Sequence, residues 1–143
     1  MSPIAITGIE AIDHVGIAVP SLPEALTFYQ NHFAGRLLHQ EENGEQGVVE
    51  AMVAIGSEPG PVIQLLAPNS PNSPIARFLE KNGPGIQQLA FRVENVRLAA
   101  EQAGALGIRV LYDNPKRGTN DALINFLHPK DCGGVLIELI EAK

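Results

Sequence analysis

The stretch IDHVGIAV, residues 12–19, is matched position by position by IQQLAFRV, residues 86–93. A second pair, VIQLL at 62–66 and LIELI at 136–140, matches at the same offset of 74 residues. Each stretch is a short apolar run of the kind that forms buried strands. Apolar strands can look alike by chance, but a constant offset across two separate pairs predicts an internal structural duplication.

The segments between these strands repeat the same order of elements. In each half, a helix follows the first strand and three further strands follow the helix. The first helix begins at the capping box Ser21–Glu24 and is expected to end at Gly35. A short helix over 74–82, capped by Ser73, connects the halves. The remaining predicted elements are strands at 36–39, 48–55 and 62–67, a helix at 96–106, and strands at 108–112, 123–127 and 135–140.

The length of 143 residues predicts a single domain, 1–143, made of two β-α-β-β-β modules. Module 1 covers about 10–68, a linker helix about 73–83, and module 2 about 84–141. The hydrophobic content of 45% is sufficient for a sizeable core.

Composition excludes several classes of partner. A net charge of -6 makes nucleic acid an unfavourable ligand, because nucleic-acid binding needs a basic surface. No apolar run approaches the roughly 18 residues needed to cross a bilayer. The start MSPIAITGIEAIDH lacks the basic region of a signal peptide. The single cysteine, Cys132, allows no intramolecular disulfide and fits a cytoplasmic protein.

Four polar side chains interrupt the repeated apolar strands. Under the offset, Gln88 overlies His14, and Glu138 overlies Gln64. A carboxylate or amide buried in such a strand needs a cation or a hydrogen-bond partner. Because successive side chains alternate between the faces of a strand, Gln87 is expected to point away from Gln88. The pattern predicts a site of metal-binding or proton-carrying groups on related strands.

Glu50 is a further acidic residue within an apolar strand, GVVEAMVAIG. Its counterpart at the same offset is Ile124, so Glu50 breaks the internal symmetry. A carboxylate among apolar groups has a raised pKa, which suits a general base near neutral pH.

Several motifs extend from about residue 10 to 141: DHVGIAV, EQGVVEAMV, IQLLAP, LYDNPKRG, INFLHPKD and GGVLIEL. Together they resemble one known family, the methylmalonyl-CoA epimerases of the vicinal-oxygen-chelate superfamily, which includes glyoxalase I. The resemblance implies an α+β fold in which two βαβββ modules form an open, cup-shaped mixed sheet of the glyoxalase/bleomycin-resistance type. It also implies a divalent metal ion held by His14, Gln64, Gln88 and Glu138.

This chain departs from the family pattern at two places. The family usually has His-His where this chain has Gln87-Gln88, so the donors here are one nitrogen and three oxygens. That set should weaken Zn²⁺ or Co²⁺ binding and favour harder ions such as Mg²⁺ or Mn²⁺, while Ni²⁺ also stays open. Residues 120–122 are Asn-Asp-Ala, where the family tends to have glycine, serine or basic residues near the substrate.

The activity implied by the resemblance is interconversion of (R)- and (S)-methylmalonyl-CoA, a step of propionate metabolism. Glu50 and Glu138 would carry the C2 proton to and from a metal-stabilised enediolate. The implied partners are an acyl-CoA thioester and a second copy of the chain in a homodimer. Two alternatives stay open: a divergent isomerase or lyase such as a glyoxalase I-like enzyme, and a non-catalytic ligand-binding protein. A ring-cleaving dioxygenase is disfavoured, because its iron needs two histidines and the site offers only His14.

Overall fold

The computed structural model describes residues 5–143, and the chain divides into two compact units. The N-terminal unit consists of residues 14–87. The C-terminal unit joins the segment that precedes residue 14 to residues 88–143. The division falls inside two strands, β1 (Ile9–Ala18) and β5 (Gly85–Val93).

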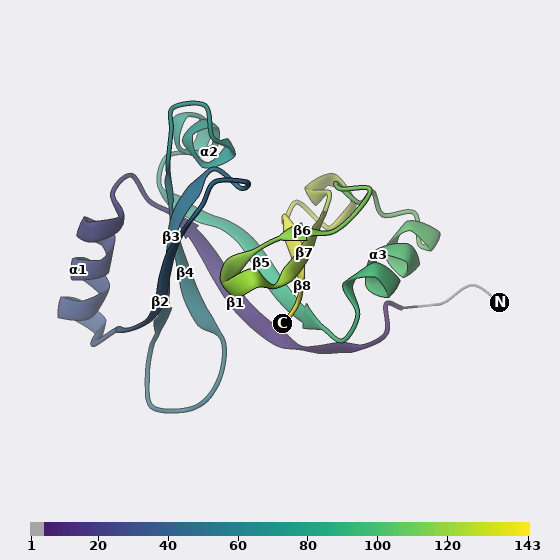
Figure 1. The fold of residues 1–143 in the computed structure, drawn as a ribbon, viewed down its shortest axis with the longest axis horizontal. Coiled ribbons are helices and arrows are strands. Elements are labelled where there is room, and N and C mark those ends of the chain that lie inside the picture. Colours follow the sequence, from purple (N-terminus) through teal and green to yellow (C-terminus); the bar gives the residue numbers. More distant parts are fainter. Residues whose placement is uncertain (1–4) are drawn as a thin grey trace. The chain divides into compact units, whose positions relative to one another are not determined.

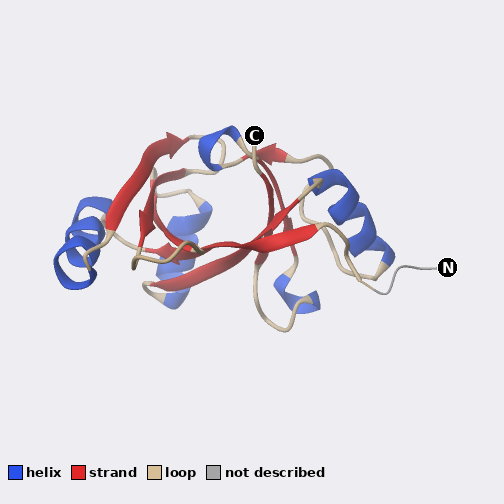
Figure 2. Cartoon of the chain, turned by 90° about the horizontal axis from the view of Figure 1, so that it is seen from below, coloured by secondary structure: helices blue, strands red, loops and turns tan. Residues whose placement is uncertain are grey.

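The N-terminal unit contains a mixed sheet with the strand order β2-β3-β4-β1 (Figure 1). The β1–β4 pair is parallel, whereas the β2–β3 and β3–β4 pairs are antiparallel. The helix α1 packs along one face of this sheet (Figure 2). The elements are α1 (Leu22–Phe33), β2 (Arg36–Asn43), β3 (Val48–Ala54), β4 (Val62–Pro68) and α2 (Pro74–Asn82).

The helix ends follow local sequence signals, with one correction. Ser73 caps α2 by accepting a hydrogen bond from the Ala76 N–H at 3.1 Å, and α2 has the predicted bounds. The helix α1 was predicted to end at Gly35, but Ala34 takes the left-handed conformation, with φ 53°. Gly35 is needed for packing instead, because a Cβ there would lie 2.8 Å from the Val53 side chain.

The C-terminal unit repeats this arrangement with the strand order β5-β8-β7-β6. Its β5–β8 pair is parallel, and its β7–β8 and β6–β7 pairs are antiparallel. The elements are α3 (Val96–Ala105), β6 (Lys116–Arg117), η1 (Thr119–Asp121), β7 (Leu123–Leu127), η2 (Pro129–Asp131) and β8 (Ile137–Glu141).

The strand registers reproduce the sequence repeat. Gly16 lies opposite Gln64 in one unit, and Ala90 lies opposite Glu138 in the other. Both residues of the second pair follow those of the first by 74 positions, the offset found in the sequence. The predicted α+β class with two modules of a mixed sheet is therefore confirmed.

The predicted strand at 108–112 is wrong, and a side chain explains why. The Leu111 N–H donates to the Phe126 carbonyl at 2.8 Å, as in a strand pair. At Tyr112, however, the Asn125 side chain binds both backbone groups, accepting from the N–H at 3.1 Å and donating to the carbonyl at 3.0 Å. Backbone pairing stops there, and the two-residue β6 takes the edge position of the sheet.

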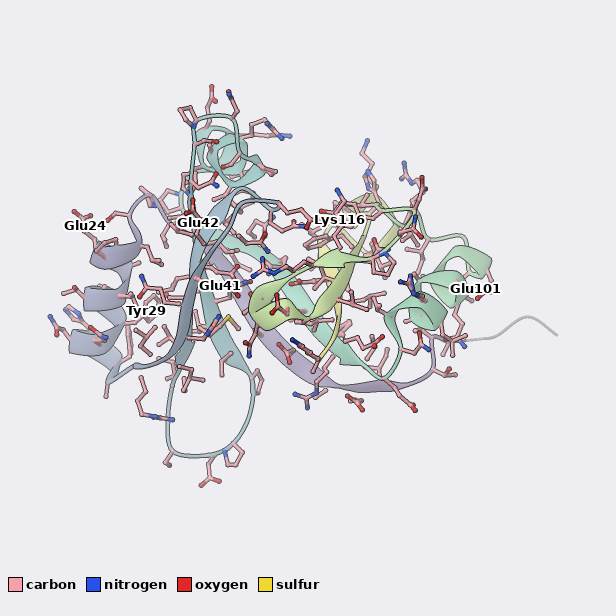
Figure 3. The ribbon with its side chains drawn as sticks, in the orientation of Figure 1. Glu24, Tyr29, Glu41, Glu42, Glu101 and Lys116 are labelled. Atoms are coloured by element: carbon pink, nitrogen blue, oxygen red, sulfur yellow. The ribbon has the colours of Figure 1, made fainter. Side chains whose placement is uncertain are left out.

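In each unit, one face of the sheet packs against a helix, α1 or α3. In the N-terminal unit α2 also packs on part of the other face, where Ile75 contacts Ala18 and Leu66. Tyr29 points from α1 toward the strands, whereas Glu24 lies on the outer side of α1 and Glu101 on the outer side of α3 (Figure 3). The buried residues of the helix-facing layers include Val19, Ala51, Val53, Leu65 and Ala67 in the N-terminal unit and Val93, Leu127, Ile137 and Leu139 in the C-terminal unit.

The part of the chain that the structure describes, residues 5–143, contains no helix with both the length and the apolar content of a membrane span.

An ion pair fastens the irregular segment before β6 to η2. Asp131 accepts hydrogen bonds from the Arg109 backbone N–H at 3.0 Å and from its guanidinium Nε at 2.8 Å. The side-chain hydrogen bond from Arg109, together with the backbone one, lowers the pKa of Asp131 to about 2.

This lowered pKa predicts a pH-dependent contribution of Asp131 to stability. The contribution should be complete above the unfolded-state pKa of about 3.9 and should disappear as the pH falls toward 2. Asp131→Asn should therefore lower the urea midpoint at pH 7, and the gap to the wild type should narrow between pH 4 and pH 2. Asp113→Asn, at an exposed position of the same unit, is the matched control. A gap that is the same at every pH would contradict the assignment.

Candidate active site

Three of the predicted site residues lie on one face of the N-terminal unit's sheet, the face opposite α1. His14 on β1, Glu50 on β3 and Gln64 on β4 are 0%, 3% and 4% exposed. Alternation along each strand puts their neighbours Ile17, Ala51 and Leu65 in the core under α1. The strands therefore place apolar side chains toward the helix and these polar side chains on the opposite face.

A hydrogen bond joins two of these side chains. Gln64 Nε2 donates to Glu50 Oε2 at 3.0 Å. The two residues are diagonal neighbours, because Glu50 lies opposite Leu66 and Gln64 lies opposite Met52 in the β3–β4 pair. The amide thus supplies a donor to a carboxylate that has been removed from water.

The C-terminal unit also has a glutamine–glutamate pair, at positions that do not correspond to the first pair in the repeat. Gln88 on β5 and Glu138 on β8 are 3% and 4% exposed, and Gln88 Nε2 donates to Glu138 Oε1 at 3.1 Å. They lie on the face opposite α3, where the apolar cluster contains Ala90, Ala122, Ile124 and Ile140. Gln87, on the other face of β5, is half-buried.

At the position of Glu50 the two units differ in polarity, because its counterpart in the repeat, Ile124, is apolar. Glu50 lies opposite Leu66, and its counterpart Ile124 lies opposite Ile140 in the same antiparallel register. The C-terminal unit fills that position with a buried apolar side chain. The fold therefore does not require a carboxylate there, which points to a chemical role for Glu50.

No sequence pattern indicated Glu41 and His39, which lie on β2 beside Glu50. Glu41 is directly opposite Glu50, its side chain is 15% exposed, and His39 Nε2 lies 3.0 Å from Glu41 Oε1 (Figure 3). A β-bulge after Leu37 shifts the register, so His39 and Glu41 share the face of Glu50. Simple alternation along the strand does not reveal this placement.

The donors in the two pairs fit a hard divalent cation. Each amide nitrogen is directed at a carboxylate, and amide oxygens are among the ligands that hard cations accept. In the N-terminal unit His14 adds an imidazole nitrogen to the oxygens of Glu50 and Gln64, whereas Gln88 and Glu138 of the C-terminal unit offer oxygens, the donors that Mg²⁺ and Mn²⁺ prefer. Within residues 5–143 there is no group of three or more histidine, cysteine, aspartate or glutamate side chains placed to hold a metal.

The segment at 120–122, which departs from the family pattern, is a tight turn. Asn120 and Asp121 both have positive φ, 58° and 59°. Arg117 forms an ion pair with Asp121, and its hydrogen bond lowers the Asp121 pKa. The ion pair supports an otherwise unfavourable backbone conformation next to the buried Ala122.

Comparison with known proteins gives consistent matches over both units. Residues 13–126 match the glyoxalase/bleomycin resistance protein/dioxygenase superfamily. The chain is 36% identical to the human mitochondrial methylmalonyl-CoA epimerase, over 92% of this chain and 73% of that protein. A crystal structure of methylmalonyl-CoA epimerase from Mycobacterium tuberculosis is 44% identical with a TM-score of 0.91, covering 100% of this chain and 93% of that one. A structure of methylmalonyl-CoA epimerase in complex with methylmalonyl-CoA and NH4+ is 41% identical with a TM-score of 0.89, covering 94% and 95%.

The Gln64–Glu50 hydrogen bond predicts different effects of two substitutions on stability. Glu50→Gln keeps an oxygen that accepts from Gln64 Nε2, so the free energy of unfolding should change by less than about 1 kcal/mol. Gln64→Leu removes the donor and should destabilise the fold by about 1–3 kcal/mol. Urea denaturation measures both values. Equal destabilisation by the two substitutions would show that the charge of Glu50 is itself structural.

Proposed function

The chain belongs to the glyoxalase/bleomycin resistance protein/dioxygenase superfamily, and we propose that within it the protein is an epimerase that interconverts (R)- and (S)-methylmalonyl-CoA. One observation carries the proposal beyond the similarity to known epimerases. Glu50 is a buried carboxylate, held by Gln64, at a position where the repeat shows that an apolar residue suffices.

The reaction needs groups that move one proton. The C2 proton of the substrate is weakly acidic, because it is flanked by a thioester and a carboxylate. Glu50 as a carboxylate takes this proton, and the electron pair of the C–H bond delocalises toward the thioester carbonyl. Glu138 as a carboxylic acid gives a proton to the opposite face of C2, which inverts the centre. In the reverse direction the two residues exchange roles.

The glutamines position the two acids. Gln64 fixes the Glu50 carboxylate and Gln88 fixes the Glu138 carboxylate, each through a single amide hydrogen bond. Burial of all four side chains keeps water from the carbon acid and maintains the orientation of the carboxyl oxygens. The proposal assigns the same acid–base role to two carboxylates on different strands, β3 and β8.

The proposal includes a divalent metal ion bound by His14, Gln64, Gln88 and Glu138, with Mg²⁺ or Mn²⁺ favoured by the oxygen-rich donors. Such an ion would supply positive charge for the substrate oxygens as the C2 proton leaves. We also propose, from the family resemblance alone, that the two modules form one domain and that the protein is a cytoplasmic homodimer.

Proton exchange at C2 of methylmalonyl-CoA tests the function. In D₂O, the metal-stripped protein should incorporate little deuterium, and Mg²⁺ or Mn²⁺ added singly should restore incorporation. Glu50→Gln and Glu138→Gln should each slow inversion by at least about 100-fold, the usual contribution of a general acid or base. Mass spectrometry follows the deuterium, and chiral analysis of the acid follows the inversion.

Glu42→Gln is the matched control for these variants, because Glu42 is an exposed glutamate of β2 (Figure 3). It should epimerise at the wild-type rate. A folded protein that shows no exchange with Mg²⁺, Mn²⁺, Co²⁺ or Zn²⁺ would refute the epimerase and would leave the isomerase, lyase and ligand-binding alternatives.

Gln88→His tests the metal proposal without relying on activity. The imidazole replaces an oxygen donor by nitrogen and should raise the affinity for Zn²⁺ or Co²⁺ by about tenfold or more relative to Mg²⁺. Isothermal titration of the metal-stripped proteins measures the affinities, and Gln87→His on the other face of β5 is the control. Equal metal affinities in the wild type and in both variants would remove Gln88 from the ligand set.

A further inference from the structure

A lysine and two aromatic rings extend from beside Glu138 to the edge of the C-terminal unit's sheet. Lys116 on β6 lies directly opposite Ile124 on β7, and Phe126 on β7 lies directly opposite Glu138 on β8. Opposed residues on adjacent strands point to the same face. Lys116 and Phe126 therefore share the face that carries Glu138.

Contacts between the side chains connect these positions. The Lys116 ammonium lies 4.2 Å from the centroid of the Tyr112 ring. The Tyr112 ring in turn packs edge-to-face on Phe126, with centroids 5.8 Å apart. Asn125 binds the Tyr112 backbone through two hydrogen bonds, and Phe126 packs on the Tyr112 ring, so both parts of the residue next to Lys116 have a defined contact.

The neighbouring cation is arranged differently. Arg117 lies opposite Leu123, on the other face of the sheet, and is ion-paired with Asp121. Lys116 is exposed, and within residues 5–143 its ammonium contacts an aromatic face rather than a carboxylate. Lysine normally loses considerable side-chain entropy when it binds a ligand, and contact with a ring reduces that loss.

We propose that Lys116, oriented by Tyr112, binds the phosphate groups of the substrate's coenzyme A moiety. This inference rests on the proposed function and identifies where the non-reacting part of the substrate is held. The protein carries a net charge of -6, so a polyphosphate ligand needs a local cation to offset the overall repulsion. Lysine binds phosphate as a point charge, and the Tyr112 and Phe126 rings provide an apolar surface for the pantetheine arm.

The position of Lys116 suits this role. Its strand is separated from β8 by one strand, which places β6 roughly 10 Å from the strand of Glu138. A long, flexible arm connects the reacting thioester to the phosphates of coenzyme A. A cation on the same face as Glu138, but at the exposed edge of the sheet, can therefore bind the phosphates while the acyl group reacts.

Two substrates that differ only in the phosphates test the inference. Lys116→Ala should raise KM for methylmalonyl-CoA about tenfold, as loss of one charge-assisted phosphate contact predicts, and should leave kcat unchanged. It should leave KM for methylmalonyl-pantetheine, which lacks the phosphates, at the wild-type value. Lys116→Arg should retain most of the affinity, and added salt should reduce the difference between the wild type and Lys116→Ala.

Lys130→Ala is the matched control, because it removes the same charge from an exposed position of the same unit. An unchanged KM for methylmalonyl-CoA in Lys116→Ala would overturn the inference, as would an equal rise for both substrates. Titration with free coenzyme A separates this inference from the proposed function. Suppose that the protein does not epimerise. The site is then supported if Lys116→Ala binds coenzyme A more weakly than the wild type and Lys130→Ala do. It is refuted if all three proteins bind coenzyme A equally.

Discussion

A carboxylate on the buried face of a sheet needs a hydrogen-bond donor or a cation beside it, and this constraint governs both units of the protein. Each unit meets it with a glutamine: Gln64 donates to Glu50, and Gln88 donates to Glu138. The helices α1 and α3 cover the opposite faces, where only apolar side chains are needed. The polar pairs are thus confined to one face of each sheet by the two-residue periodicity of the strands.

Much of the fold could be predicted because the repeat and the helix caps are local signals. The offset found in the sequence reappears in the registers Gly16–Gln64 and Ala90–Glu138. The strand expected at 108–112 failed because its pairing is ended by Asn125, whose side chain occupies the Tyr112 backbone. That competition depends on a residue 13 positions further along the chain, so the segment itself contains no sign of it.

The buried polar positions were predicted in part, for similar reasons. Alternation along single strands was enough to indicate buried polar positions such as His14 and Gln88. The partner of Glu50 could not be identified, because Gln64 meets it diagonally across an antiparallel pair whose register depends on the intervening turn. Glu41 was missed because a bulge in β2 exchanges the faces of the strand. Non-local pairing thus limits what a single sequence can establish about a site.

The duplication provides two similar sheets, but the proposed chemistry does not follow its symmetry. If the carboxylates were equivalent, they would lie at 50 and 124 or at 64 and 138. Glu50 and Glu138 instead lie at non-equivalent positions, with the glutamine on β4 in one unit and on β5 in the other. Inversion at carbon requires an acid and a base that approach opposite faces of one centre, which two equivalent copies need not provide. The backbone repeat therefore supplies two similar supports, and substitutions at a few paired positions give the two sheets different chemistry.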